Sequence, residues 1–198
     1  MQNRDLSIDL LRFLGLTMIV LVHVNPPFWL TQFRSFDVPM MVFVSGLTVA
    51  RKEVSSYVGY IVKRTKRLVI PVWTFLAFYL LGFYYLQFWI LPDQYLTGRM
   101  ILRSFLLLDQ SIGYVWIIRV FLLIMLLPPP IYTYIDKSLT TKGFLFLMLI
   151  LIIFQELLCR IHFEQQFNWP VISTLFEQYL LYFFGYVVIF MFGIRLRY

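Results

Sequence analysis

The sequence is poor in the residues from which many metal and redox sites are built, with one cysteine and two histidines among 198 residues. The single cysteine, Cys159, excludes an intrachain disulfide and any metal site made of several cysteines. His23 and His162 are far apart in the chain, and a metal site needs more ligands than these two supply. His162 also lies in an expected polar loop, beside Arg160 and Glu164. We therefore expect no bound metal.

Charge is scarce as well. Only 14% of the residues are charged, 61% are hydrophobic, and the mean hydropathy is +0.79, whereas soluble domains are roughly 45–50% apolar. Residues 68–92 and 178–194 carry no charge at all, and each run approaches or exceeds the ~20 residues that cross a bilayer core. The composition excludes an ordinary soluble domain and predicts a polytopic membrane protein.

Apolar segments recur along the whole chain, separated by short polar connections. They lie near residues 8–25, 36–50, 68–91, 113–135, 143–159 and 174–194. The second is short and contains Pro39 and Gly46, so it either tilts, thins the bilayer locally or is partly re-entrant. The three prolines at 128–130 predict a kink or a helix end. We predict an all-α fold, a single bundle of about six membrane helices over residues 1–198.

The net charge of +7 comes from basic residues beside the apolar segments. Many of these residues flank the segments: Arg51, Lys52, Lys63, Arg64, Lys66, Arg67, Lys137, Lys142, Arg195 and Arg197. This pattern follows the positive-inside rule and leaves no basic soluble face for nucleic acid. It predicts that residues 51–67 and both termini are cytoplasmic. Residues 54–71 read as an amphipathic cytoplasmic helix that starts at Ser55 or Ser56 and lies on the membrane surface before Pro71 opens the third segment.

Two ionisable residues occupy the first apolar segment. Arg12 and His23 are eleven residues apart, which at ~100° per residue brings them within ~20° of one another on a helix and ~16 Å apart along its axis. Asp9 lies three residues before Arg12 and can pair with it. Ionisable groups at membrane depth usually point at a cavity or a partner, so this face is a candidate site. The alternative is that Arg12 snorkels to the interface and His23 merely precedes the turn at residues 25–27.

A second constellation is the run KRTKR at residues 63–67. On a helix Arg64 and Arg67 are neighbours at i and i+3, so their two guanidinium groups can hold phosphate oxygens in bidentate fashion. The alternative is a topogenic cluster that sits on anionic lipid and sets the orientation of the chain.

Arg119 stands within the apolar stretch WIIRVFLL. Such a residue is expected to face the interior of a bundle, either paired with another group or lining a cavity. The sequence does not identify its partner.

Taken in order, four stretches resemble acyltransferase family 3, the bacterial membrane O-acyltransferases of cell-surface polysaccharides. RDLSIDLLRFLGLTMIVLVHV has the family's arginine, ten residues, histidine pattern at Arg12 and His23, and FDVPMMVFVSGLTVARK is like its F-x-V-P-x-F-F-x-x-S-G segment. YIVKRTKRLVIPVW has its R-x-x-R at Arg64 and Arg67, and GYVWIIRVFLLIMLLPP is like its tryptophan-containing fourth helix. Ordered agreement over residues 4–130 is far more specific than any single motif.

The resemblance implies an inner-membrane enzyme that transfers an acyl group, most often acetyl from acetyl-CoA, to a sugar hydroxyl. The acceptor is a glycan, either a cell-surface polysaccharide or its lipid-linked precursor. Arg64 and Arg67 hold the phosphates of the CoA donor at the cytoplasmic mouth, with electrostatic help from Lys63 and Lys66. The pantetheine arm of CoA then reaches into the membrane along the ionisable face of the first segment.

The resemblance also implies a catalytic role for that face. An imidazole is suited to take a proton from a sugar hydroxyl as the hydroxyl attacks the thioester carbonyl, so His23 is the expected general base. A transient acyl-histidine carrier is a second mechanism that stays open. Arg12 either stabilises the developing oxyanion, stabilises the cofactor or positions the helix through Asp9.

Family members typically carry more membrane helices than the segments seen here. The resemblance therefore implies an N-terminal fragment, a single membrane domain that is incomplete relative to the family. Some members carry an acidic residue where this chain has Arg119, so Arg119 receives no catalytic role. The alternative function is a catalytically inactive truncated remnant or a non-catalytic membrane subunit. A small transporter ranks last, because its polar groups would be spread over several midplane helices.

Overall fold

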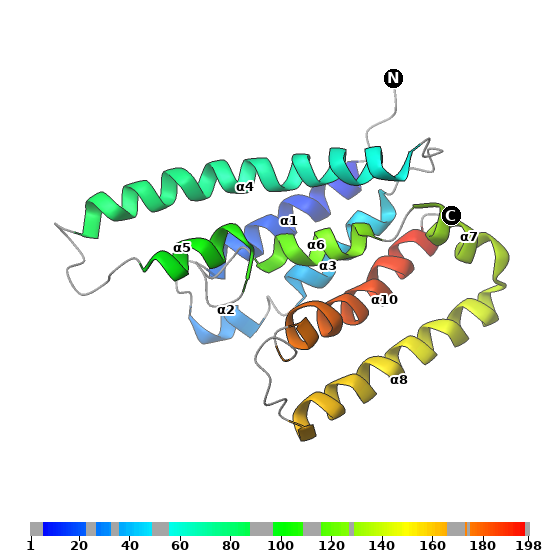
Figure 1. Cartoon of the computed structure of the whole chain (residues 1–198). Coiled ribbons are helices and arrows are strands. Elements are labelled where there is room, and N and C mark those ends of the chain that lie inside the picture. Colours follow the sequence, from blue (N-terminus) through cyan, green and yellow to red (C-terminus); the bar gives the residue numbers. More distant parts are fainter. Residues whose placement is uncertain are drawn as a thin grey trace. The chain divides into compact units, whose positions relative to one another are not determined.

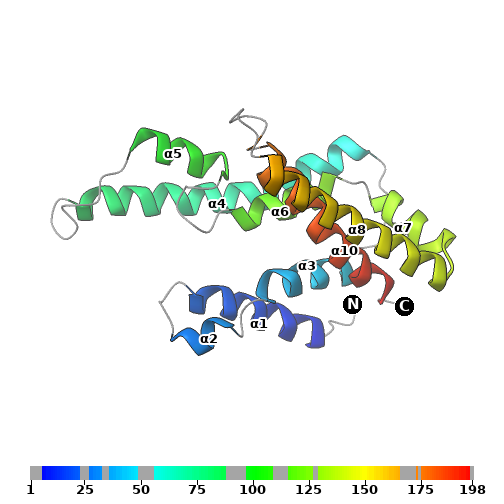
Figure 2. The ribbon, with the colours of Figure 1, turned by 90° about the horizontal axis from the view of Figure 1, so that it is seen from below.

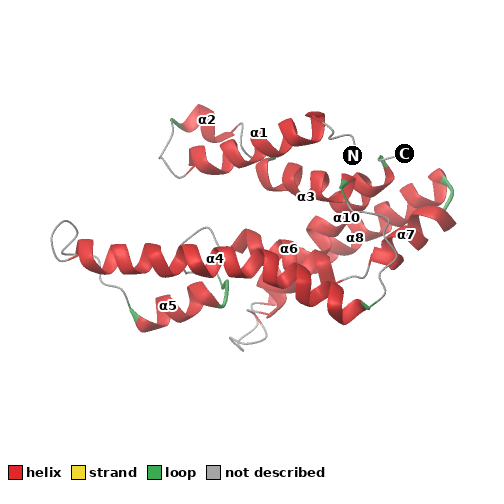
Figure 3. Cartoon of the chain, turned by 90° about the horizontal axis from the view of Figure 1, so that it is seen from above, coloured by secondary structure: helices red, strands yellow, loops and turns green. Residues whose placement is uncertain are grey.

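The computed structural model describes residues 6–22, 27–32, 36–48, 56–87, 97–108, 116–126, 129–165, 173 and 175–196. Within these ranges the chain forms helices and contains no strand (Figure 3). The helices are α1 (Leu6–Val22), α2 (Phe28–Gln32), α3 (Asp37–Leu47), α4 (Tyr57–Gln87), α5 (Gly98–Phe105), α6 (Trp116–Leu126), α7 (Pro129–Ser138), α8 (Thr141–Gln165), the π-helix η1 (Phe176–Leu181) and α10 (Tyr182–Arg195). The predicted all-α class is confirmed.

Three helices in the described ranges are long and apolar enough to cross a bilayer. They comprise Tyr57–Leu86, Thr141–His162 and Phe176–Arg195, and they coincide with three of the expected segments. The other expected segments hold shorter helices: α1 has 17 residues, and α3 and α6 have 11 each. An 11-residue helix is about 16 Å long, roughly half of a ~30 Å hydrocarbon core. The protein is a membrane protein, but the predicted count of about six spans is not confirmed.

The chain divides into two compact units. The first comprises residues 1–53, 129–166 and 181–198, and the second comprises residues 54–128 and 167–180. In the first unit α3 packs against α1 and α10, and α10 also contacts α7 and α8 (Figures 1 and 2). In the second unit α4 contacts α5 and α6 (Figure 1).

Two glycines hold the first unit together where α3 meets α10. A Cβ atom placed on Gly46 of α3 would collide with the carbonyl oxygen of Phe190, and one placed on Gly193 of α10 would collide with the carbonyl oxygen of Phe43. The two backbones approach each other so closely that no larger residue fits at either position. Tyr132 packs its ring edge-on against Phe190 beside this contact, with 4.9 Å between the ring centroids.

The second unit is built around α4. Leu76 of α4 and Leu107 form a buried apolar cluster, against which Phe105 and Leu122 of the neighbouring helices pack. The indole nitrogen of Trp73 donates a hydrogen bond of 3.0 Å to the carbonyl oxygen of Phe105 and so ties α4 to the end of α5. These contacts fix α5 and α6 along one side of α4.

The expected amphipathic helix before Pro71 is not a separate element. Ser56 does cap a helix there, since its Oγ accepts a hydrogen bond of 3.3 Å from the backbone N–H of Gly59. That helix, however, continues through Pro71 to Gln87 as α4, a single helix of 31 residues (Figure 1). A proline removes one backbone donor and one hydrogen bond, and the long apolar helix on either side tolerates this loss.

Helix α6 is described up to Leu126 and α7 from Pro129. Residues 127 and 128 lie outside the described residues, so the kink or helix end expected at the three prolines stays a prediction. Proline is favoured in the first turn of a helix because its fixed φ suits the helix and its missing N–H is not needed there. The described residues of the expected fourth segment belong to α6 and α7.

Candidate functional site

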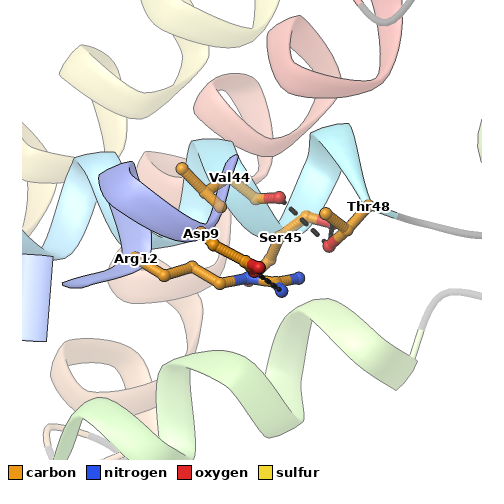
Figure 4. Close-up of polar contacts among 5 residues, drawn as sticks. All are labelled: Asp9, Arg12, Val44, Ser45 and Thr48. Atoms are coloured by element: carbon orange, nitrogen blue, oxygen red, sulfur yellow. Dashed lines mark hydrogen bonds and ion pairs between the residues drawn. The ribbon is translucent and has the colours of Figure 1, made fainter. Parts of the chain in front are cut away.

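Arg12 and Asp9 form the predicted pair on α1. Arg12 Nη1 lies 3.5 Å from Asp9 Oδ1, and Figure 4 shows the two side chains pointing toward one another. The side chains are 45% and 29% exposed, so the pair lies on an open face of the helix rather than in a core. His23 lies outside the described residues. Its place on the same face stays a prediction.

Helix α3 lies against α1 in the same unit. Gly15 of α1 is buried, and a Cβ atom there would lie 2.7 Å from the sulfur of Met41, so α3 closely covers this face of α1. Hydroxyl groups at the end of α3 bond to the backbone of their own helix. Ser45 Oγ donates to the carbonyl oxygen of Met41 at 2.9 Å. Thr48 Oγ1 donates to the carbonyl oxygen of Val44 at 3.1 Å (Figure 4). The contact at Gly15 fixes which face of α1 meets α3.

The basic cluster of residues 63–67 lies on α4. Lys63, Lys66 and Arg67 are exposed, whereas Arg64 is half-buried with its guanidinium 5.7 Å from the ring centroid of Tyr60. Tyr60 was missed by the sequence analysis, although its i, i+4 spacing from Arg64 is a helical signal. Four cations on two turns of one helix suit an anionic cofactor. In the part of the chain described, no three His, Cys, Asp or Glu side chains gather as a metal site would need.

Arg119 faces the interior of the second unit, as its apolar surroundings predict, and is only 3% exposed. Its Nη1 donates hydrogen bonds to the carbonyl oxygen of Leu107, at 3.0 Å, and to Oε1 of Gln178, at 2.7 Å. Its guanidinium carbon lies 5.5 Å from the ring centroid of Tyr179. The sequence could not name these partners because they lie 12 and 59 residues away along the chain.

A cavity of about 280 Å³ lies in the second unit beside Arg119. Helix α4 contributes Ile61 and Thr65 to its wall, and η1 contributes Tyr179. Leucine and methionine side chains of α6, together with the leucines that follow α5, complete an apolar lining. Arg119 is the charged residue of the wall. No local pattern in the sequence predicts this cavity.

Two backbone irregularities bring the partners of Arg119 into place. Leu107 has φ of 58°, and among the described residues it is the one non-glycine residue with positive φ. This left-handed conformation costs a branched residue about 1–2 kcal/mol. Gln178 and Tyr179 belong to η1, a π-helical turn, and such turns occur frequently at functional sites. Residues from both irregular segments therefore contact the guanidinium group of Arg119.

The fold and these sites define an all-helical membrane protein with a cationic cluster on one long helix and a buried arginine in an apolar cavity. The model of the family described as acyltransferase domain matches residues 5–194. The match extends over nearly the whole chain, so the chain belongs to acyltransferase family 3 and is a membrane acyltransferase. A comparison with curated proteins gave no match, and neither did a comparison with solved structures.

Proposed function

We propose that the chain transfers an acetyl group from acetyl-CoA to a sugar hydroxyl of a cell-surface polysaccharide or of its lipid-linked precursor. The protein acts in the inner membrane with both termini in the cytoplasm. Membership of the acyltransferase family supports the reaction class. The position of the basic cluster on α4 is the observation that supports a CoA donor.

The cluster stands where a water-soluble donor meets the membrane. After Arg67, α4 runs without charge from residue 68 to Gln87, which at 1.5 Å per residue is about 30 Å and equals the hydrocarbon core. Arg64 and Arg67 therefore stand at one end of this uncharged run, and we take that end to be the cytoplasmic boundary of the core. Guanidinium groups bind phosphate oxygens in bidentate fashion, so these two residues hold the CoA phosphates. The neighbouring lysines add attraction at longer range.

The chemical step uses the ionisable face of the first segment. His23 takes the proton of the sugar hydroxyl as the hydroxyl oxygen attacks the thioester carbonyl, so that a C–O bond forms and the carbonyl oxygen becomes an oxyanion. The C–S bond then breaks, and the CoA thiolate leaves and takes the proton back from the imidazolium. Arg12, positioned by Asp9, donates to the oxyanion or to the cofactor. In the acyl-histidine alternative, His23 carries the acyl group before the sugar attacks.

The proposal is tested on the surface polysaccharide of a deletion strain complemented with this chain. Proton NMR before and after mild alkali measures its O-acetyl content. The intact chain restores the acetyl signals, whereas His23→Ala and Arg64→Ala each abolish them. Lys142→Ala, which removes an exposed cation from α8, is the matched control and retains them. Wild-type acetylation by His23→Ala would overturn the mechanism.

The same strain tests the alternative. An inserted chain that restores no acetyl signal, and whose substitutions have no effect, would favour the inactive remnant or the non-catalytic subunit. Membrane insertion is checked by fractionation in every strain.

A further inference from the structure

The turn between α7 and α8 lies beside the end of α10, within the first unit (Figure 1). Nη2 of Arg195 donates hydrogen bonds to the carbonyl oxygen of Leu139, at 3.4 Å, and to Oγ1 of Thr141, at 3.3 Å. The guanidinium carbon of Arg195 also lies 5.4 Å from the ring centroid of Phe144, which is buried. The last residue of α10 therefore fixes the turn in place.

Two candidate membrane spans meet at this turn. Thr141–His162 begins there and Phe176–Arg195 ends there, and the bond between Arg195 and Thr141 joins the two ends. The two spans have 22 and 20 residues, which is the length that crosses the hydrocarbon core and ends at the headgroup region. Side chains at the turn are therefore at the level of lipid phosphate groups.

The turn carries an excess of positive charge. Lys137, in the last turn of α7, and Lys142, in the first turn of α8, are exposed and lie on either side of it. Neither lysine forms an ion pair with a described residue. Arg195 adds a third cation, whereas residues 129–155 contain one acidic residue, Asp136. Such a cluster at the membrane surface attracts anionic lipid headgroups.

An exposed apolar stripe on α8 continues from Lys142 into the membrane span. The residues three, four, seven and eleven positions after Lys142 share its helix face: Leu145, Phe146, Leu149 and Ile153. Each of these four side chains is at least half exposed. The stripe is about 16 Å long, roughly half of the ~30 Å hydrocarbon core. One acyl chain of a lipid in the same leaflet therefore fits along it.

A cation at the head of an apolar stripe is complementary to an amphiphile, not to a soluble phosphate. The ammonium groups of lysine bind phosphate oxygens as point charges. A zwitterionic lipid would bring its own cation close to the cluster, whereas an anionic lipid brings none. The turn and the stripe together therefore fit an anionic phospholipid.

We propose that the turn between α7 and α8 binds an anionic glycerophospholipid. Lys137 and Lys142 hold the phosphate group, and one acyl chain lies along the exposed stripe of α8. The phosphate offsets the repulsion between the cations and, by binding the folded state, stabilises the contact of the turn with α10. The lipid is not a reactant in the proposed transfer of the acyl group, so Lys142→Ala loses the lipid and retains polysaccharide acetylation.

The test compares two lipids that differ in headgroup charge. The purified full chain is titrated in detergent micelles with dioleoyl phosphatidylglycerol or dioleoyl phosphatidylcholine, and native mass spectrometry measures each dissociation constant. The wild type binds phosphatidylglycerol, the anionic lipid, more tightly. Lys137→Ala and Lys142→Ala each lower this preference about fivefold, whereas Lys142→Arg retains it.

Arg160→Ala is the matched control. It removes an exposed cation from the other end of α8, where Arg160 pairs with Glu156, and it keeps the preference of the wild type. An equal loss of preference in Arg160→Ala and Lys142→Ala would show that only the net charge of the chain matters, and it would overturn the site.

Glycerol 3-phosphate, which has the phosphate group but no acyl chain, distinguishes a lipid from a soluble ligand. It does not displace phosphatidylglycerol, and Phe146→Ser, which interrupts the stripe, weakens both lipids without changing the preference between them. Displacement of the lipid by an equal concentration of glycerol 3-phosphate would overturn the lipid as the occupant. Equal affinities of the wild type for the two lipids, or a wild-type preference in both lysine-to-alanine variants, would overturn the proposal as a whole.

Discussion

The contact of α3 with α10 and the cavity beside Arg119 differ in how closely their atoms are packed. At the first, Gly46 and Gly193 bring two backbones together and leave no room for a single added carbon atom. At the second, a buried arginine and large apolar side chains leave about 280 Å³ open. Each lies within one unit of the chain and joins helices that are distant in sequence.

The difference indicates how each region contributes to the protein. Close backbone contact in a membrane protein stabilises helix association through van der Waals packing, since apolar burial gives little gain among lipid tails. An open space beside a fixed guanidinium lowers packing density, and a strained Leu107 adds to the cost. We therefore assign the glycine contact to stability, whereas the cavity lowers it.

The largest expected effect on stability is at the glycine contact. Gly193→Ala places a methyl group against the carbonyl oxygen of Phe43, so α10 must move away from α3. We expect the free energy of unfolding to fall by about 1–3 kcal/mol or more, as for other overpacked positions. Unfolding in detergent micelles, followed by circular dichroism against added SDS, measures it.

Gly82→Ala is the matched control for that experiment. Nothing lies within 4 Å of a Cβ atom at this position of α4. Alanine is favoured over glycine in a helix by up to about 1 kcal/mol, so Gly82→Ala leaves stability equal or slightly higher. Equal effects of the two substitutions would show that α3 and α10 do not depend on close backbone contact.

A smaller effect on stability is expected in the cavity region. Gln178→Leu removes the acceptor of a 2.7 Å hydrogen bond from Arg119 and leaves a buried donor to find another partner. We expect a loss of about 1–2 kcal/mol in the same unfolding assay. Gln178→Glu supplies an ionised acceptor at the same place and retains the stability of the wild type. If Gln178→Leu proved as stable as the wild type, the bond would not hold Arg119 in its orientation.

The sequence predicts local features of this molecule well. The pairing of Asp9 with Arg12 follows from a spacing of three residues on one helix. The interior position of Arg119 follows from its apolar neighbours. Each of these depends on residues within a few positions of one another.

Features that depend on distant residues could not be predicted. Gln178 and Tyr179 reach Arg119 because η1 is π-helical, and nothing in the local pattern of FEQYLL indicates that turn. The left-handed conformation of Leu107 could not be predicted from the sequence either, because leucine rarely adopts it. For helix α4 a local signal gave a wrong prediction. Pro71 suggested a boundary between two helices, but the structure has one continuous helix there.

The smallest effect on stability, with the sharpest contrast in function, is expected at Arg12. Its pair with Asp9 lies on an open face, and exposed pairs contribute about 0–1 kcal/mol, so Arg12→Ala changes the unfolding curve little. Arg160→Ala breaks a more exposed pair with Glu156 on α8 and is the matched control. Because the proposed function places Arg12 beside the reacting carbonyl, Arg12→Ala lowers polysaccharide acetylation severely, whereas Arg160→Ala leaves it unchanged. The two variants are compared at equal amounts of inserted protein. Equal acetylation would show that Arg12 has no role in the reaction and would favour the interpretation that its side chain snorkels to the interface.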